Sequence, residues 1–436
     1  MKSSIIVIEP VMQKICFMNN TYVYNFHKEE LKSSFEKSRL MKISLAAPTY
    51  LSAVVMPIKR CLNLNNESSA LGGVEDVNGK FIDGTNFQTK TEIGYHYDNH
   101  DICHKDVVYI GLMHSCYGHM ITDSIAKLWY LQTEEYKNTK KPLLYISDVP
   151  LKKWQYEILE LAGVDLNKLI TVDNVTRFNS IIVPDNSQIR VPGGEHYWSN
   201  EFRMTLDFMI SRAIEKVPVN DVKKVYFTRT KWNRIYDDYG EGMVEPLFKK
   251  AGYKIYSPET YSVAQQIAIM QGADEMVSTD CSSAHNAIFM RPGSKMVLLR
   301  KGLFINYYSV MINEVCKLQT TVIDCSMSIL NRNGQFAYAG PFFIYPNNNL
   351  CKYLKIKRKE FPYYKFRKYI RGVWRRTLPE SLLMELAYAT EMMEEIEYTK
   401  RVLDAKLLNF IPNFLQRYVV RKLKKWILNY KLGGIF

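Results

Sequence analysis

The stretch that decides the fold is VVYIGLMHSCYGHMITDSIAKLWYL, residues 107–131. Residues 107–112 form a short apolar run, which predicts a buried strand. From Gly118 onward the apolar residues recur with a period near 3.6, which predicts a helix. The helical series comprises Met120, Ile121, Ile125, Leu128, Trp129 and Leu131. A strand that leads directly into a helix is the repeating unit of α/β proteins.

Three titratable side chains interrupt this stretch at spacings that carry chemical meaning. His119 and Asp123 are four residues apart, so they share one face of a helix. His114 lies on the strand-to-helix connection, where α/β proteins commonly place chemistry. A carboxylate can hold an imidazole in one tautomer and make it a better base for a hydroxyl group. The alternative is a His and an Asp that pair only to cap or solvate a helix turn.

The chain on either side continues the α/β pattern. Residues 1–60 predict peripheral strands and a helix, and residues 63–99 predict an irregular approach with a hairpin across Asn78 and Gly79. Further strands are expected at residues 143–147, 169–172 and 180–183, with helices at 152–162 and about 200–216. Such alternation predicts a parallel sheet covered by helices on both faces.

A second series of strands and helices follows a linker at residues 216–224. Strands are expected at residues 225–228, 253–256, 275–278, 295–299 and 320–324, and helices at 243–251, 262–271 and 283–290. The sequence therefore predicts two Rossmann-like domains that face a cleft. We expect domains at residues 1–218 and 219–350, followed by a helical extension at 351–436.

The positive charge of the chain is concentrated at its carboxyl end. The formal net charge is +14. Residues 351–436 contain 20 Lys and Arg against 8 Asp and Glu, a net charge of +12, which leaves +2 for the first 350 residues. This division separates a nearly neutral body from a tail that an anionic surface attracts.

The last part of the tail combines this charge with helical periodicity. Apolar and aromatic residues recur at helical spacing between Phe414 and Tyr430, while most cations lie outside that stripe. A basic amphipathic helix of this kind can lie in the surface of an anionic bilayer. Packing of its apolar face on the protein or on a second copy is the alternative, and a homo-oligomer stays open. Nucleic-acid binding is not expected.

Cysteine usage bears on the compartment. The eight cysteines are scattered without a Cys-x-x-Cys pair, which indicates neither a zinc site nor a disulfide framework. The amino-terminal apolar run is too short for a signal peptide or a membrane span. We expect a cytoplasmic protein that lies peripherally on the inner face of the cell membrane.

Two stretches of the second half could bind an anionic ligand. Arg229 follows a predicted strand and Arg234 lies five residues later, where guanidinium groups can grip a diphosphate. Asp280, Cys281, Ser282 and Ser283 form a strand-to-helix turn whose N–H groups could bind a phosphate. Surface arginines and ordinary helix capping are the alternatives.

Several common sites are missing from the sequence. There is no Gly-x-Gly-x-x-Gly and no P-loop, which argues against a dinucleotide oxidoreductase or an NTPase. No Asp-x-Asp stands in a position to hold a metal–nucleotide complex, so we predict metal independence and no cofactor. The adjacent Asp237 and Asp238 side chains should diverge in an extended segment.

Taken in order, these motifs resemble glycosyltransferase family 61, the capsular-polysaccharide type. The family's His-x-x-x-Gly-His-x-x-x-Asp stretch matches His114, Gly118, His119 and Asp123. The later matching elements are Arg229, Gln265 or Gln266, Ala273-Asp274, Asn286, Phe289, Pro292 and Gly293. The resemblance implies a GT-B fold and an inverting, metal-independent transfer from a nucleotide sugar that the second domain binds. A glycan or lipid-linked acceptor in capsular polysaccharide or exopolysaccharide synthesis would receive the sugar.

The resemblance also has two departures. The family's His-Gly-Ala-Gly turn is replaced by Asp280-Cys281-Ser282-Ser283, and a glutamate suited to a ribose is replaced by Leu298. An aspartate beside a diphosphate is electrostatically costly unless it binds a sugar hydroxyl. The alternatives are therefore a catalytically silent GT-B-like module that binds glycan or scaffolds polysaccharide assembly, and a transferase of pyruvyl or phosphoryl groups.

Overall fold

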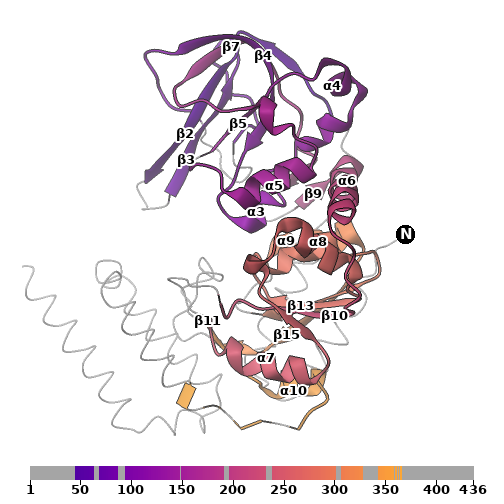
Figure 1. The fold of residues 1–436 in the computed structure, drawn as a ribbon. Coiled ribbons are helices and arrows are strands. Elements are labelled where there is room, and N and C mark those ends of the chain that lie inside the picture. The colour runs from indigo at the N-terminus through magenta and orange to yellow at the C-terminus, as the bar shows by residue number, and fades with distance from the viewer. Residues whose placement is uncertain are drawn as a thin grey trace, which may run out of the picture.

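The computed structural model describes residues 45–62, 68–86, 94–147, 149–190, 196–231, 238–300, 306–327, 342–357, 359–360, 362 and 364–365. These residues form two main sheets, each covered by helices, and two smaller ones, which confirms the α/β class (Figure 1). The first sheet is built from residues before 183 and the second from residues after 223.

The first sheet has seven strands in the order β3-β2-β7-β4-β5-β6, with β1 paired to β7. Its strands are β1 (Thr49–Leu51), β2 (Val54–Leu62), β3 (Ser68–Glu75), β4 (Asp101–Leu112), β5 (Leu143–Ile146), β6 (Leu169–Ile170) and β7 (Thr176–Ile182). Strand β4 runs parallel to β5 and β7, as predicted. The prediction of a wholly parallel sheet is wrong, because β1 and β2 pair with β7 and β2 pairs with β3 in antiparallel fashion.

The predicted turn at Asn78 and Gly79 is confirmed. The Asp76 carboxylate accepts hydrogen bonds from the backbone N–H groups of Asn78 and Lys80, each at 2.9 Å. Gly79 has φ +75°, a conformation that favours glycine. An antiparallel bridge between Glu75 and Phe81 closes the turn.

The prediction of a continuous helix from Gly118 to Leu131 is wrong. Only one turn is α-helical, α3 (Tyr117–Met120), and the chain then turns until the 3-10 helix η1 (Leu128–Gln132). The carbonyl of His119 accepts N–H groups from residues 122, 123 and 124 at 3.3, 2.7 and 3.1 Å, so the regular helical ladder does not continue. The apolar stripe is nevertheless buried, because the turns keep Met120, Ile121 and Ile125 facing the core.

Further helices and a hairpin complete this half of the molecule. They are α4 (Glu134–Thr139), α5 (Lys153–Leu161), η2 (Leu166–Lys168) and α6 (Asn200–Lys216), with the antiparallel pair β8 (Gln188–Arg190) and β9 (His196–Trp198). Helices α5 and α6 match the helices expected at residues 152–162 and about 200–216. Gly163, at φ +95°, follows α5 and reverses the chain in a conformation that other residues rarely adopt.

The second sheet has five strands in the order β12-β10-β13-β14-β15, and all its pairings are parallel, as the sequence predicts. The strands are β10 (Lys224–Phe227), β12 (Lys254–Tyr256), β13 (Glu275–Thr279), β14 (Lys295–Arg300) and β15 (Gln319–Asp324). The helices are α7 (Glu241–Lys250), η3 (Pro258–Thr260), α8 (Val263–Gly272), η4 (Ala284–Phe289), α9 (Tyr307–Cys316) and α10 (Asn348–Tyr353). Short strands β11 (Asp238–Tyr239), β16 (Ser326–Met327) and β17 (Phe342–Ile344) form a separate sheet.

Helices lie on both faces of the second sheet (Figure 1). Val244 and Phe248 of α7 pack with Leu350 of α10 in one core cluster. Residues of α8, η4 and α9 belong to another cluster, which also contains Met120 and Ile121 and residues of α5 and α6. A continuous apolar core therefore joins the helices of the second sheet to those of the first.

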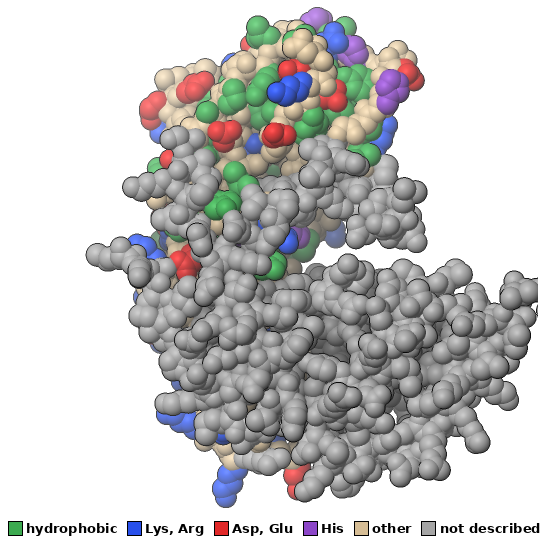
Figure 2. All heavy atoms as spheres, turned by 180° about the vertical axis from the view of Figure 1, so that it is seen from behind, with side chains coloured by type: hydrophobic (Ala, Val, Ile, Leu, Met, Phe, Trp, Pro, Cys, Tyr) green, Lys and Arg blue, Asp and Glu red, His purple; other side chains and the backbone are tan. Residues whose placement is uncertain are grey.

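The basic extension at 351–436 lies outside the described residues for most of its length, as do the elements expected before residue 45. Within the described part of the chain, no helix is long and apolar enough to cross a membrane. Among the described residues, no disulfide involves Cys103, Cys116, Cys281, Cys316, Cys325 or Cys351. Figure 2 shows acidic and basic side chains mixed over the visible face of the first sheet, in keeping with a nearly neutral body.

Candidate active site

The candidate site lies where the connection after β4 meets η4 and the start of α9. Tyr117 in α3 donates a hydrogen bond of 2.7 Å from its hydroxyl to Oδ1 of Asn286 in η4. Tyr308 in α9 donates one of 2.7 Å to Oδ2 of Asp123. The site is thus assembled from side chains more than 160 residues apart in the sequence, and α3 lies near α9 in Figure 1.

Local hydrogen bonds shape the connection that carries the predicted residues. The Ser124 hydroxyl donates to the carbonyl of Leu112 at 2.8 Å and accepts the N–H of His114 at 3.0 Å. The carbonyl of His114 accepts from the Gln155 side chain at 2.9 Å. These bonds tie the end of β4 to the turn after α3, so His114 and Asp123 are brought near one another.

His119 and Asp123 form the pair that their spacing predicts. Nδ1 of His119 lies 2.7 Å from Oδ2 of Asp123, the same oxygen that accepts from Tyr308. The Asp123 side chain is only 5% exposed, whereas that of His119 is 31% exposed. The carboxylate is therefore enclosed and the imidazole reaches toward solvent.

The electrostatics of the pair fix its protonation. Burial raises the pKa of the Asp123 carboxyl, but the hydrogen bond and charge of His119 outweigh burial and hold that pKa below its ordinary value. Burial lowers the pKa of His119. The hydrogen bond to Asp123 and the negative charge of that carboxylate outweigh burial, so the pKa of His119 is raised above 6.5. Because an ionised carboxylate only accepts hydrogen bonds, Nδ1 of His119 carries the proton and Nε2 carries the lone pair in the neutral ring.

Three other histidines surround this pair. The ring of His114 lies 5.2 Å from that of His119. Burial lowers the pKa of His285 to about 3, and burial together with Arg190 lowers that of His196 to about 4. His285 and His196 are therefore neutral at physiological pH, and His119 is the histidine whose pKa is raised.

Sequence reasoning missed Tyr308, His285 and His196. His285 lies inside the SSAHNAIF stretch but was not singled out, and Tyr308 lies in no motif. Tyr308 contacts both rings, with centroids 5.5 Å from His285 and 4.9 Å from His196. The only available signal for His285 was its position one residue before the predicted Asn286.

The turn from Asp280 to Ser283 has mainly internal contacts. Asp280 is 1% exposed and accepts from the N–H of Asn306 at 2.9 Å and the hydroxyl of Ser309 at 3.0 Å. The N–H groups of residues 284, 285 and 286 donate to the carbonyls of residues 281, 282 and 283. The helix predicted at 283–290 is the short 3-10 helix η4, so these N–H groups face the turn itself.

The remaining predicted residues lie near this turn. Ser282 contacts Cys116 at 3.5 Å between Oγ and Sγ, and the Ser283 hydroxyl lies 2.7 Å from that of Ser278. Asn286 is fully buried and joins the two halves through Tyr117. Phosphate binding at Ser282, Ser283 and Asn286 stays a prediction.

Arg229 follows β10 on the same edge of the second sheet. Phe227 is in register with Ser278, so Arg229 and Asp280 each come two residues after paired strand positions. The backbone N–H of Arg229 lies 3.3 Å from each oxygen of Glu241. Arg234 lies outside the described residues. Leu298 is fully buried in β14, so its side chain faces the core.

No group of three or more His, Cys, Asp or Glu among the described residues is arranged to hold a metal ion. Metal independence stays a prediction, because the sequence argument alone supports it.

Comparison with known families identifies one domain. The family model described as Glycosyltransferase 61 matches residues 117–297. The matched segment runs from α3 into the first half of β14 and includes His119, Asp123, Arg229 and the 280–283 turn. No match is found among curated proteins. Residues 117–297 thus carry a glycosyltransferase 61 domain, which identifies the protein as a glycosyltransferase.

Proposed function

We propose that this family 61 glycosyltransferase is an inverting, metal-independent enzyme that moves a sugar from a nucleotide sugar to a glycan or lipid-linked acceptor. The observation that carries the proposal is the hydrogen-bonded series Tyr308–Asp123–His119 between the two sheets. A single positioned base suits a one-step displacement at the sugar carbon, which inverts its configuration.

His119 is the general base in this mechanism. Asp123 holds Nδ1–H, so the lone pair on Nε2 can take the proton of the acceptor hydroxyl as the new glycosidic bond forms. The imidazolium that results is stabilised by the ionised, buried carboxylate. Tyr308 fixes the carboxylate from the opposite half of the molecule. Asp123 is a positioning residue, since it acts through His119.

Arg229 is the residue proposed to stabilise the leaving nucleoside diphosphate. It stands at the carboxyl edge of a parallel sheet, where open α/β proteins bind ligands. A guanidinium group there neutralises charge that develops on the departing phosphate, in the role that a metal ion has in other transferases. Arg234, Ser282 and Ser283 are proposed to contribute to the same donor site.

The arrangement of two helix-covered sheets around this site supports a GT-B fold, with the acceptor on the first sheet and the donor on the second. The basic tail supports a location at the inner face of the cell membrane, where a lipid-linked acceptor for capsular polysaccharide or exopolysaccharide would reside. Vesicle pelleting tests the location. The full chain should pellet with vesicles that contain phosphatidylserine and a chain ending at residue 376 should not, whereas equal pelleting would refute the role of the tail.

A two-step experiment tests the transferase proposal. Thermal melts with a panel of nucleoside diphosphates and nucleotide sugars identify the nucleotide that stabilises the fold. The matching nucleotide sugar is then incubated with candidate acceptors, and products are detected by mass spectrometry. Stabilisation by one nucleotide class followed by sugar transfer supports the enzyme. Stabilisation by none of them would favour the silent glycan-binding scaffold. The buried Leu298 and the internally bonded Asp280, which depart from the family pattern, are the observations that support this alternative.

An Arg229→Ala variant tests the donor site. We expect its affinity for the stabilising nucleoside diphosphate to fall about 10- to 100-fold, because a charge-assisted hydrogen bond is lost. Arg291→Ala is the matched control, since Arg291 pairs with Asp274 on the surface of the same half. Equal nucleotide affinity in the two variants would remove Arg229 from the donor site.

A further inference from the structure

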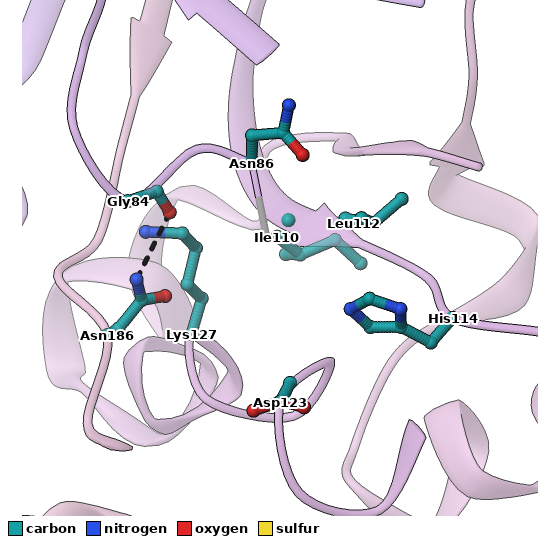
Figure 3. Close-up of a pocket in the computed structure, with 9 residues that line it drawn as sticks. Gly84, Asn86, Ile110, Leu112, His114, Asp123, Lys127 and Asn186 are labelled. Atoms are coloured by element: carbon teal, nitrogen blue, oxygen red, sulfur yellow. Dashed lines mark hydrogen bonds between the residues drawn. The ribbon is translucent and has the colours of Figure 1, made fainter. Parts of the chain in front are cut away.

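Each half of the molecule places a buried carboxylate beside a residue that is proposed to act on the substrates. In the first half, Asp123 lies below His114 in the small pocket of Figure 3 and holds His119. In the second half, Glu241 at the start of α7 is 2% exposed and faces the segment that carries Arg229. The mechanism proposed above uses Asp123 but not Glu241.

The contact of Glu241 with Arg229 is made at the point where strand β10 ends. The strand ends at Phe227, and the N–H of Thr228 still donates to the carbonyl of Tyr256 at 2.8 Å. The N–H of Arg229 follows and lies 3.3 Å from each carboxylate oxygen of Glu241, so the two oxygens share it. The carboxylate thus fixes the direction of the backbone at Arg229.

A second carboxylate of α7 holds the residues on either side of Arg229. Oε1 of Glu245 accepts hydrogen bonds from the hydroxyls of Thr228 and Thr230, the latter at 2.6 Å. The Thr228 hydroxyl in turn accepts the N–H of Thr230 at 3.1 Å. Glu241 and Glu245 are four residues apart, so they share the face of α7 that meets this segment. One helix face therefore holds residues 228–230 through both backbone and side chains.

The start of α7 is itself fixed against the sheets. Gly240 precedes the helix at φ +92°, and a Cβ atom there would clash with the carbonyl oxygen of Ile344 in β17. Glycine therefore lets the start of α7 approach β17 closely. Tyr226 of β10 packs against Phe248 of α7 with ring centroids 4.9 Å apart, and its hydroxyl donates to Oε1 of Glu241 at 3.0 Å. These contacts set the place of the Glu241 carboxylate relative to the second sheet.

Negative charge at this edge of the sheet needs a reason. The carboxyl edge of a parallel sheet is where α/β proteins bind ligands, and a carboxylate there opposes a diphosphate. A neutral acceptor could satisfy one N–H without that cost, but only a carboxylate presents two equivalent acceptor oxygens. Orientation of the Arg229 backbone, and with it the guanidinium group, is a role that uses both oxygens of Glu241.

We propose that Glu241 and Glu245 are positioning residues for Arg229, which they hold in the orientation that binds the diphosphate of the donor. The proposal rests on the proposed function, because Arg229 is the residue assigned there to the diphosphate. It adds how the donor site is built: one face of α7 presents the guanidinium group to the phosphates. The alternative is that the two carboxylates only stabilise the second half.

Nucleotide affinity tests the proposal without any sugar transfer. Isothermal titration of the full chain with UDP, GDP, ADP and dTDP gives the Kd of the nucleotide that binds most tightly. We expect Glu241→Gln to raise this Kd at least about 5-fold, because the amide replaces one acceptor oxygen with a donor. In an Arg229→Ala background the same change should alter the Kd less than about 2-fold, because residues that act through one another are not additive.

Three further variants separate positioning from a purely structural role. Tyr226→Phe removes a hydrogen bond to Glu241 and keeps the one from Arg229, so it should lower Tm and leave the Kd unchanged. Glu245→Gln, at a half-buried residue, should raise the Kd and keeps the test informative if the buried Glu241→Gln change unfolds the protein. Glu259→Gln, at an exposed residue of the same half, is the matched control and should change neither Tm nor Kd.

The outcomes distinguish this proposal from the proposed function. If both glutamate variants bind the nucleotide as the wild type does, or if Glu241→Gln weakens binding equally with and without Arg229, the positioning role is wrong even where sugar transfer is observed. If no nucleoside diphosphate binds the wild-type chain, both proposals fail. If affinity depends on Glu241 through Arg229 while no sugar is ever transferred, the positioning role stands within a nucleotide site and the transferase proposal fails.

Discussion

At the scale of single residues, the account depends on how Asp123 divides its two oxygens. Oδ2 holds His119 and Tyr308 at 2.7 Å each, and Oδ1 faces no described donor. The first interaction fixes the tautomer of the base.

The raised pKa of His119 predicts the acidic limb of the pH profile. The base must be neutral, so kcat/KM should fall as pH drops through the pKa of His119, at a pH above 6.5. In Asp123→Asn the limb should move to lower pH, because the contacts that raise this pKa are lost and burial remains. Steady-state rates between pH 5 and pH 9 measure both. A limb at or below 6.5 in the wild type would exclude His119 as the base in this form.

The contribution of His119 to folding stability falls as pH rises, whereas kcat/KM is expected to fall as pH drops. His119 binds its proton more tightly in the folded chain, so its contribution is complete below 6.5 and is lost as pH rises through the folded-state pKa. Asp98→Asn is the control for both readouts, because the His96–Asp98 pair is almost fully exposed. This change should shift neither the kinetic limb nor the dependence of Tm on pH.

The sequence predicted the His119–Asp123 pair correctly although the long helix expected there does not form. A single helical turn already places residues i and i+4 together, so α3 and the turn after it suffice. Tyr308 could not be predicted, because it reaches Asp123 across 185 residues and depends on how the halves pack. The buried role of Asp280 was missed for the same reason: its partners lie on α9.

At the scale of elements, the close contact of α3 with η4 positions the site. Gly118 is buried, and a Cβ atom there would lie 2.5 Å from Nδ1 of His285 and 3.1 Å from Oγ of Ser282. Only a residue without a side chain lets the two elements approach so closely. The glycine between the two predicted histidines thus serves packing between the halves.

Gly118→Ala should therefore lower stability by about 1–3 kcal/mol through overpacking. Gly242→Ala in α7 is the control, because nothing lies within 4 Å of its added Cβ and the change should be neutral or slightly stabilising. Thermal melts compare the two. In a His285→Ala background the Gly118→Ala change should cost less. An unchanged Tm for Gly118→Ala in the wild-type background would show that α3 and η4 are not held in this contact.

Local patterns predicted the second sheet better than the first. Its strands are short apolar runs separated by helices, and parallel pairing follows from such crossovers. The β2–β3 pairing was not predicted, because residues 1–60 indicated only unassigned peripheral strands and residues 63–99 indicated an irregular approach rich in turn residues. Gly72 and Gly73, both at φ +132°, are positions where strand β3 approaches Pro57 and Phe81 closely, and a glycine-rich segment carries no alternation to reveal a strand.

At the scale of the whole molecule, a shared apolar core and several hydrogen bonds hold the halves together. Tyr117 to Asn286 and Tyr308 to Asp123 are hydrogen bonds between them, and one core cluster contains residues of both. The sequence predicted two facing α/β units, but the contacts between them come from side chains that no local pattern distinguishes. The basic tail, the clearest whole-chain signal, lies largely outside the described residues.

Tyr117→Phe tests the contact between the halves. The change leaves Oδ1 of the fully buried Asn286 without its donor and should lower stability by about 1–3 kcal/mol. Tyr364→Phe, at a side chain that is 68% exposed, is the control and should leave Tm unchanged. A Tyr117→Phe protein that melts with the control would indicate that this hydrogen bond does not hold the halves together.

The most direct test of the central claim is the rate of sugar transfer in Asp123→Asn. The account predicts a kcat about 10²- to 10⁴-fold below the wild type, because His119 loses the carboxylate that orients and stabilises it. Asp207→Asn removes an i,i+4 partner of Arg203 at a carboxylate that is 56% exposed, and this variant should transfer sugar at the wild-type rate. Wild-type transfer by Asp123→Asn, with its Tm near that of the wild type, would contradict the account.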